Sequence, residues 1–201
     1  MKNKKVKEIK FQNTAWNFEV DKVNLYSFWN DAFSKEECQT IVDIAKNKNL
    51  IEGTIGEKSR ANIRNSKISW LYPHDNMDWV FRRVTDIVLN LNERFFKFDL
   101  FGINEGFQFT NYQAPSGKYG KHVDRAINIA VRKLSISIQL TNPEKYEGGD
   151  LYLYNDDEKI PMDKTQGTLI MFPSYVLHEV MTVTKGERNS LVTWVTGPQF
   201  K

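Results

Sequence analysis

The sequence predicts an α+β protein in which N-terminal helices support a jelly-roll β core. Two observations indicate this: the hydrophobic period changes near residue 106, and Gly, Pro, Asp and Asn then divide the chain into many short apolar runs. The 201 residues, 40% of them apolar, are enough for one substantial core. We therefore expect a single domain over residues 1–201, with mostly helical support over about 1–105 and the jelly-roll core over about 106–200.

The first part of the chain contains two helical patterns. Ser34 followed by Glu37 is a capping-box signature, and apolar residues then recur on one helical face until the polar N-K-N at 47–49. A longer apolar stripe runs from about Asn76 to Phe96 and is expected to pack onto a sheet. The polar segment between the helices, Gly53 to Arg64, is either a surface connection or a loop over the site.

From Phe107 onward the apolar residues alternate with a period of two, which is typical of strands. The run R-K-L-S-I-S-I-Q-L has one apolar face and one polar face that can line a cavity, the polar one formed by Ser135, Ser137 and Gln139. L-Y-L-Y, T-L-I-M-F and S-L-V-T-W-V indicate further strands, separated by turns at N-D-D-E-K, P-S-Y and T-K-G-E. Gly148 and Gly149 are expected to form a bend or bulge.

His122, Asp124 and His178 are candidate ligands for one metal ion. The side chains of H-x-D point to the same side of an extended segment, and a second strand can bring His178 beside them. Two imidazoles and one carboxylate, with the opposite face open, are typical of non-haem Fe(II) oxygenases. Arg188 and Ser190 follow the T-K-G-E turn on one face of a strand, where a guanidinium and a hydroxyl can hold a carboxylate.

The run Y-Q-A-P-S-G-K-Y-G-K-H-V-D, followed in order by R-K-L-S-I-S-I-Q-L, Y-E-G-G-D-L, F-P-S-Y-V-L-H-E-V and V-T-K-G-E-R-N-S-L-V-T-W, resembles a known family. It is similar to the 2-oxoglutarate- and Fe(II)-dependent dioxygenases of the prolyl 4-hydroxylase type, and most of all to the small bacterial and phage PKHD-type hydroxylases. The resemblance covers about Phe107 to Phe200. It implies that the jelly roll is a double-stranded β-helix.

The resemblance also implies roles for individual residues. His122, Asp124 and His178 would hold Fe(II), and Arg188 would pair with the distal carboxylate of 2-oxoglutarate. The other co-substrate contacts would come from Tyr112, Ser190 and Gln139, although Gln139 stands where the similar animal oxygen-sensing enzymes carry a tyrosine, which leaves its role open. Contacts with a substrate peptide would come from Arg132 and Trp194.

The implied reaction is hydroxylation of a prolyl residue in a peptide or protein. It would use Fe(II), O2 and 2-oxoglutarate, which is decarboxylated to succinate and CO2, with ascorbate as a candidate reductant. One alternative is the same chemistry on a free amino acid or another small molecule. The other is a non-catalytic, cupin-like metal- or ligand-binding protein, which would give Arg188 and Tyr112 no role.

Composition narrows the possible partners and compartment. The formal net charge is only +3, and the basic opening M-K-N-K-K-V-K lacks the aromatic residues that stack on bases, so no nucleic-acid partner is expected. The single cysteine, Cys38, fits a reducing compartment, and no apolar run has membrane-spanning length. These features predict a cytoplasmic protein and leave monomer and homodimer open. His74 and Asp150 are expected to be surface and turn residues, whereas Tyr119 either packs the mouth of the barrel or contacts a ligand.

Overall fold

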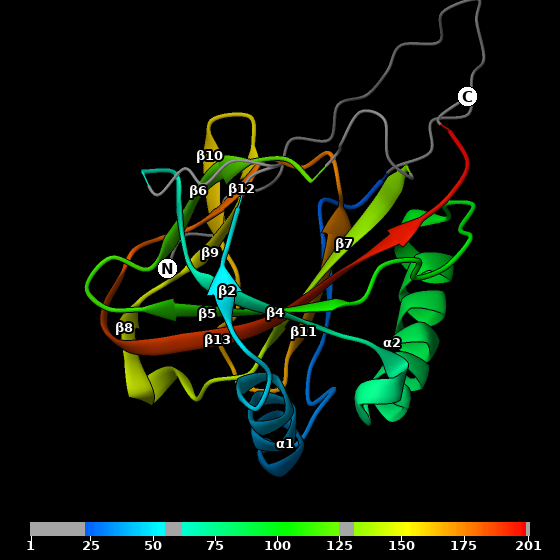
Figure 1. Cartoon of the computed structure of the whole chain (residues 1–201). Coiled ribbons are helices and arrows are strands. Elements are labelled where there is room, and N and C mark those ends of the chain that lie inside the picture. Colours follow the sequence, from blue (N-terminus) through cyan, green and yellow to red (C-terminus); the bar gives the residue numbers. More distant parts are fainter. Residues whose placement is uncertain (1–22, 55–61, 125–130, 200–201) are drawn as a thin grey trace, which may run out of the picture.

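The computed structural model describes residues 23–54, 62–124 and 131–199, and its strands form two facing antiparallel sheets (Figure 1). The larger sheet has the order β1 (Ser27–Trp29), β11 (Leu169–Pro173), β7 (Arg132–Gln139), β13 (Val183–Thr196), β5 (Phe107–Gln113), β4 (Lys67–Leu71) and β2 (Ile51–Glu52), with β8 (Tyr146–Gly148) paired to β13. The smaller sheet has the order β10 (Glu158–Pro161), β9 (Leu151–Asn155), β12 (His178–Val180), β6 (Lys118–His122) and β3 (Arg64–Asn65). This architecture agrees with the predicted jelly-roll core.

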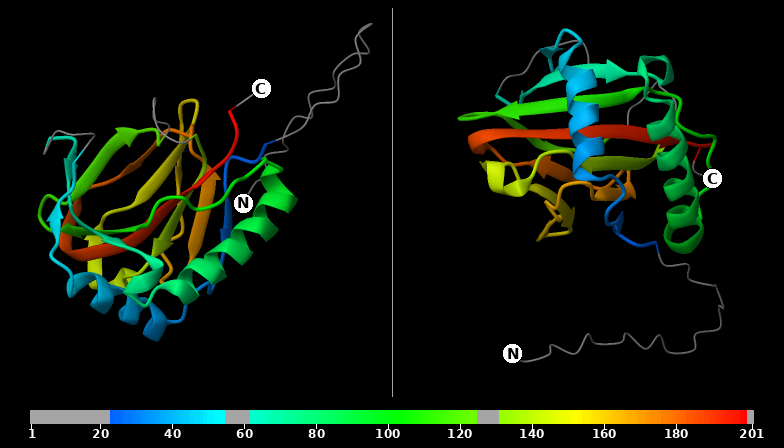
Figure 2. Two further views of the ribbon diagram at one scale, coloured as in Figure 1. Left: turned by 45° about the vertical axis from the view of Figure 1, so that its right-hand side comes forward. Right: turned by 90° about the horizontal axis from the view of Figure 1, so that it is seen from below.

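Two helices, α1 (Lys35–Lys46) and α2 (Asp78–Leu91), cover the outer face of the larger sheet (Figure 2). The predicted capping box begins α1: Ser34 Oγ accepts a hydrogen bond from the Glu37 amide at 3.2 Å, and the Ser34 amide donates to Glu37 Oε2 at 2.9 Å. The second predicted helix is confirmed, but a π-helical turn at Asn92–Phe96 replaces its last turn. Asn92 holds that turn through two hydrogen bonds with the backbone of Phe98.

The alternation predicted for the R-K-L-S-I-S-I-Q-L strand is confirmed in β7. Its apolar residues, including Leu134, Ile136 and Ile138, are fully buried in the core beneath the helices. Burial of each such side chain stabilises the fold by roughly 1.5–3 kcal/mol. Ser135 and Ser137 project from the opposite face into the space between the sheets. The helices thus fix the larger sheet as the back wall of a cavity.

The structure adds strands to the predicted helical support and corrects one predicted turn. In the described part of residues 1–105, β1, β2, β3 and β4 lie beside the helices; three of these strands have only two or three residues, too few to show a period of two. The T-K-G-E segment is not a turn, because β13 runs unbroken through it. Gly186 has φ +70° and lies so close to the Lys145 carbonyl oxygen that a Cβ would clash with it, so the glycine permits the approach of β8.

The other predicted glycine feature is confirmed. Gly148 and Gly149 bend the chain with φ values of +74° and +63°, next to an irregular register between β8 and β13. The basic opening and residues 55–61 of the Gly53 to Arg64 segment lie outside the described residues. Within the described part of the chain, neither helix is long and apolar enough to cross a membrane.

Candidate active site

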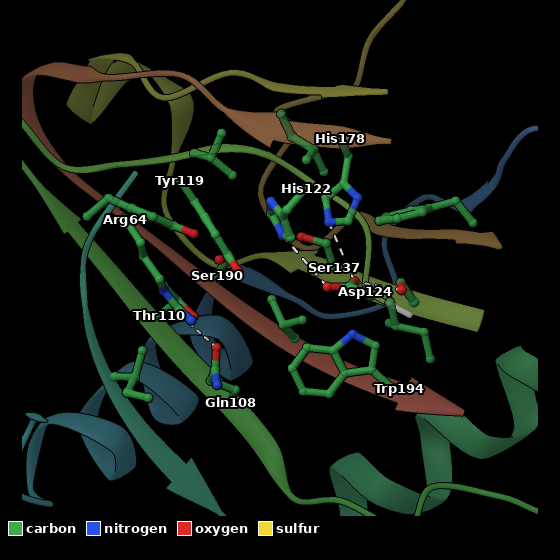
Figure 3. A pocket seen from close by; sticks show the side chains of 18 of the residues that line it. Arg64, Gln108, Thr110, Tyr119, His122, Asp124, Ser137, His178, Ser190 and Trp194 are labelled. Carbon is green, nitrogen blue, oxygen red and sulfur yellow. Dashed lines mark hydrogen bonds and ion pairs between the residues drawn. The ribbon is translucent and has the colours of Figure 1, made fainter. Parts of the chain in front are cut away.

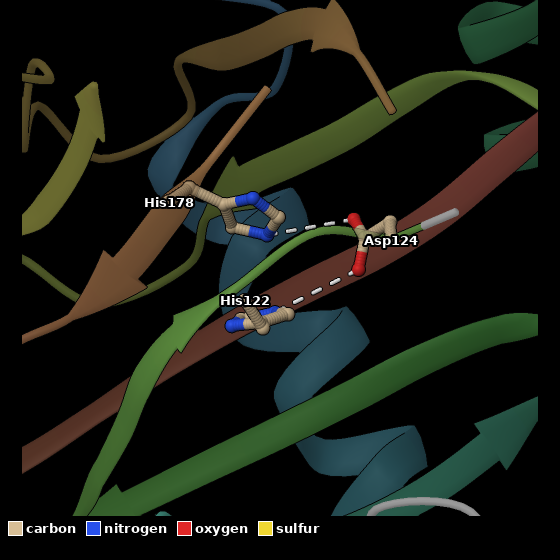
Figure 4. A group of neighbouring side chains, drawn as sticks. All are labelled: His122, Asp124 and His178. Carbon is tan, nitrogen blue, oxygen red and sulfur yellow. Dashed lines mark ion pairs between the residues drawn. The ribbon is translucent and has the colours of Figure 1, made fainter. Parts of the chain in front are cut away.

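The three predicted metal ligands come together where β6 and β12 pair. His122 ends β6, His178 begins β12, and the two residues are direct partners across the strands. Asp124 follows β6 by two residues, and its amide donates to the Ser174 carbonyl oxygen at 3.0 Å. Asp124 Oδ1 lies 3.7 Å from His122 Nε2, and Asp124 Oδ2 lies 3.5 Å from His178 Nε2 (Figure 4). One ligand atom from each residue therefore lies within 4.8 Å of the other two.

Both imidazoles direct Nε2 toward Asp124 and Nδ1 toward a backbone carbonyl oxygen. His122 Nδ1 lies 2.8 Å from the Gly120 carbonyl oxygen, and His178 Nδ1 lies 2.9 Å from that of Val176. A carbonyl oxygen only accepts, so each Nδ1 carries a proton and Nε2 is the nitrogen that can bind a metal ion. Such bonds fix the ring orientation and tautomer of metal-binding histidines.

The charges of these residues also suit a cation. Burial and the neighbouring His178 lower the pKa of His122 to about 4, so this imidazole is neutral at pH 7. Burial raises the pKa of Asp124, but both histidines and nearby hydrogen-bond donors outweigh it and hold this pKa below its ordinary value. Ser135 Oγ is one such donor, at 2.7 Å from Asp124 Oδ2. Two imidazoles and one carboxylate form a donor set that fits Fe(II).

The triad borders a cavity of about 360 Å³ between the two sheets (Figure 3). Alternate residues of β13 form a row along its floor: Arg188, Ser190, Val192 and Trp194. Strand pairing extends this row sideways, because Arg188 lies opposite Tyr112, Ser190 opposite Thr110 and Gln139, Val192 opposite Gln108 and Ser137, and Trp194 opposite Ser135. The triad lies at the Trp194 end, since Ser135 binds Asp124, and Arg188 lies at the other end of the row.

Arg188 is a buried cation that no carboxylate neutralises within the described residues. It is only 2% exposed. Its guanidinium donates to Gln139 Oε1 at 2.9 Å and, at the longer distance of 3.5 Å, to Ser190 Oγ. The Tyr112 ring lies 5.5 Å from Arg188 Cζ, and burial raises the pKa of Tyr112. A buried guanidinium held by neutral groups has capacity for an anion, so these residues fit the distal carboxylate of 2-oxoglutarate.

The two predicted substrate residues lie together beside the triad. Arg132 binds Glu105 through two hydrogen bonds of 2.7 and 2.6 Å, and its Cζ lies 3.7 Å from the Trp194 ring. Trp194 is 6% exposed and lines the cavity. Its indole nitrogen is buried without a hydrogen-bond partner of good geometry among the described residues, but it lies close enough to Asp124 to lower the pKa of that carboxyl.

The remaining histidine and tyrosine expectations are resolved by the geometry. The side chain of His74 is 79% exposed and its ring stacks on Tyr72, away from the triad. Asp150 pairs with Lys164 at 3.2 Å and is not among the residues that line the cavity. Tyr119 lines the cavity and stacks on His122 with ring centroids 3.5 Å apart, so it both packs and faces the site.

Sequence reasoning named Arg64 only as the end of the Gly53 to Arg64 segment and did not name Gln108; both residues line the cavity (Figure 3). Arg64 lies at the end of a polar segment without a period, so its sequence carried no signal. Gln108 had one: in F-Q-F-T-N-Y, Gln108 and Thr110 alternate with buried phenylalanines, which is the same pattern that marked β7.

Comparisons with known proteins agree with this geometry. Residues 107–196 match the family model described as the 2OG-Fe(II) oxygenase superfamily. A PKHD-type hydroxylase of Crocosphaera subtropica is 27% identical over 83% of this chain and 76% of its own length. Another, of Psychrobacter sp., is 37% identical over 43% of this chain, and the matched region spans only 36% of that relative.

A solved structure has the same fold. It is a prolyl hydroxylase from Trichoplax adhaerens in complex with a peptide fragment of the hypoxia inducible factor oxygen degradation domain, with a TM-score of 0.73 and 18% identity over 87% of this chain and 84% of that one. The likeness confirms the predicted double-stranded β-helix.

Proposed function

We propose that the chain is a 2-oxoglutarate-dependent dioxygenase that hydroxylates a prolyl residue in a peptide or protein, and the match of residues 107–196 to the 2OG-Fe(II) oxygenase superfamily model supports this proposal. One observation carries the proposal: a His-Asp-His cluster and a buried guanidinium without a carboxylate partner in the described residues face the same cavity. A cupin-like metal-binding protein would have no use for that guanidinium.

Each residue has a distinct task in this proposal. His122, Asp124 and His178 would hold Fe(II), which with 2-oxoglutarate and O2 supplies the oxidising power for C–H hydroxylation. Arg188 would bind the distal carboxylate of the co-substrate, and Gln139 would orient Arg188 through their 2.9 Å bond. Gln139 would thus act on the co-substrate only by orienting Arg188. Tyr112 and Ser190 line the space that the co-substrate would occupy.

The larger sheet and the smaller sheet enclose the reacting groups. The cavity walls combine aromatic and aliphatic side chains with a few polar groups, a lining in which charge interactions are stronger than in bulk water. Arg132 is fixed by Glu105 and Trp194, so it offers a rigid edge against which a substrate can bind.

A prolyl substrate in a peptide is the finer part of the proposal. Its support is the shared fold with a prolyl hydroxylase that was solved with a peptide, and the Arg132–Trp194 pair at the edge of the cavity. A free amino acid or another small molecule is the second candidate, favoured by the modest cavity of about 360 Å³. A cytoplasmic location, supported by the single buried cysteine Cys38, and ascorbate as reductant belong to the same proposal.

Two measurements test the function. Incubation with Fe(II), 2-oxoglutarate and O2 should release succinate, and mass spectrometry of proline-containing peptides should then detect a gain of one oxygen. Arg82→Gln, which changes an exposed arginine on α2, is a matched control that should behave as the wild type. Absence of succinate under all conditions would favour the cupin-like alternative, whereas succinate without peptide oxidation would favour a small-molecule substrate.

A further inference from the structure

Arg64 is a second buried guanidinium in the cavity, on the side opposite Trp194 (Figure 3). It belongs to β3, where it pairs with Tyr119 of β6, and it is 7% exposed. Its Nε donates to Ser66 Oγ at 3.0 Å, its Nη1 to the Thr54 carbonyl oxygen at 3.0 Å and its Nη2 to Gln108 Oε1 at 2.8 Å. All three acceptors are neutral.

Arg64 shares this pattern with Arg188, whereas three other arginines in the described residues have a carboxylate partner. Arg82 binds Asp78, Arg83 binds Glu37 and Arg132 binds Glu105, although all three are more exposed than Arg64. A buried charge is costly unless an opposite charge accompanies it. A guanidinium has five N–H groups, so two of those on Arg64 have no acceptor among the described residues. The missing acceptor is therefore expected to come from a ligand.

The co-substrate does not supply it. In the loaded site of the proposed function, Fe(II), Arg188 and Arg64 would bring four positive charges, and Asp124 with the two carboxylates of 2-oxoglutarate would bring three negative ones. Arg132 adds nothing to this balance, because Glu105 neutralises it. Among the described residues one positive charge remains without a counter-charge, and Arg64 is the group that carries it.

The remaining charge lies close to the reacting centre. Arg64 Cζ is 4.6 Å from the Tyr119 ring, and that ring is 3.5 Å from the His122 ring. Together these two separations place Arg64 Cζ no farther than about 8 Å from the imidazole of His122, a proposed iron ligand. An anion on Arg64 would thus be only a few bonds from a carbon that is presented to the metal.

We infer that the substrate carries a carboxylate within reach of Arg64 when its target carbon is at the metal, and that Arg64 binds this carboxylate. The inference rests on the proposed function and narrows its substrate class. The carboxylate can be the α-carboxylate of a free or C-terminal residue, or the side chain of an acidic residue beside the target in a peptide. Gln108 is the positioning residue that aims the guanidinium.

The test compares each acid with its uncharged amide by isothermal titration calorimetry, under anaerobic conditions with Mn(II) and 2-oxoglutarate bound. One pair is N-acetyl-L-proline and N-acetyl-L-prolinamide, and the other is acetyl-Ala-Pro-Glu-amide and acetyl-Ala-Pro-Gln-amide. A charge-assisted hydrogen bond predicts that at least one acid binds about 10- to 100-fold more tightly than its amide. The pair that shows the preference identifies the source of the carboxylate.

Two variants assign the preference to Arg64. Arg64→Gln removes the charge, and Gln108→Glu keeps the guanidinium but gives it an internal carboxylate; both should abolish the preference, whereas Arg82→Gln should retain it. Equal affinities within both pairs, no binding of either acid, or a preference that survives both variants would overturn the inference. The wild-type comparison and Gln108→Glu decide the matter if Arg64→Gln does not fold. Succinate release by the wild type without any preference would refute only this inference, whereas no succinate release would refute the proposed function.

Discussion

Replacement of Arg188 by lysine separates the charge of this residue from its shape. Lysine keeps one positive charge on β13, but its ammonium is a point donor at the end of a shorter stem and cannot form a two-pronged contact with a carboxylate. It would also lose the 2.9 Å bond to Gln139, which orients the guanidinium. The distal carboxylate of 2-oxoglutarate would therefore keep its counter-charge and lose the fork.

The size of the effect follows from these contacts. A hydrogen bond to a charged group is worth roughly 1.5–3 kcal/mol, and loss of one of two such bonds corresponds to a fall of about 10- to 150-fold in apparent affinity for 2-oxoglutarate. Arg188→Ala should be worse, because it removes the positive charge that Arg188→Lys keeps at a position where the arginine is only 2% exposed. Because the lysine stem is shorter, 2-oxoadipate, which is one methylene longer than 2-oxoglutarate, should lose less affinity in Arg188→Lys.

The assay measures succinate or glutarate release against the concentration of either 2-oxo acid. We expect the ratio of apparent KM for 2-oxoadipate to that for 2-oxoglutarate to fall in Arg188→Lys relative to the wild type. The control is Arg82→Gln, which should keep both values. An unchanged dependence on 2-oxoglutarate in Arg188→Ala would show that another cation holds the acid and would refute the assignment.

Three further outcomes are expected. Asp124→Ala should abolish binding of Mn(II) measured by titration calorimetry, whereas His74→Ala should bind it normally; metal binding by Asp124→Ala would contradict the iron site. Trp194→Ala should raise KM for a verified proline peptide about tenfold, because it removes an aromatic wall of the cavity, and an unchanged KM would place the substrate elsewhere. Glu37→Gln should lower the free energy of unfolding by up to about 1 kcal/mol at pH 7, since it removes the charge that pairs with Arg83 in a partly exposed ion pair, whereas glutamine can still complete the capping box. The hydrogen bond from Arg83 lowers the pKa of Glu37 in the folded state, so the stability that Glu37 contributes is present above its unfolded pKa and is lost as the pH falls through its folded pKa. Urea unfolding should therefore show the difference in unfolding free energy between wild type and Glu37→Gln shrinking in acid. A difference that stays constant with pH would contradict this account.

The sequence was most informative where a period or a cap is local. The Ser34–Glu37 box predicted the start of α1, and the alternation in R-K-L-S-I-S-I-Q-L predicted both faces of β7. His122, Asp124 and His178 were predicted as a cluster, and the structure brings them together. In each case the prediction depended on a few consecutive residues or on motifs that occur in a fixed order.

The features that the sequence did not reveal depend on distant pairing. β3 has two residues and exists because it pairs with β6, so nothing in its own sequence marks it as a strand. Arg64 enters the cavity as a consequence of that pairing. The T-K-G-E segment has the composition of a turn, but β8 pairs along it, so Gly186 serves a close approach between strands. Local composition cannot separate these two uses of glycine.

The uninterrupted strand β13 fixes the distance between the two ends of the proposed site. Arg188 and Trp194 lie six positions apart on one strand, and a strand advances about 3.3 Å per residue. The number of strand residues therefore sets the spacing between Arg188, the proposed co-substrate anchor, and Trp194, the aromatic wall. Insertion of one residue between them would turn one end of the row away from the cavity, and removal of two would keep the facing but shorten the row by about 7 Å. Substitutions can therefore change what the cavity accepts, whereas a change in the length of β13 would move the two ends of the site relative to each other.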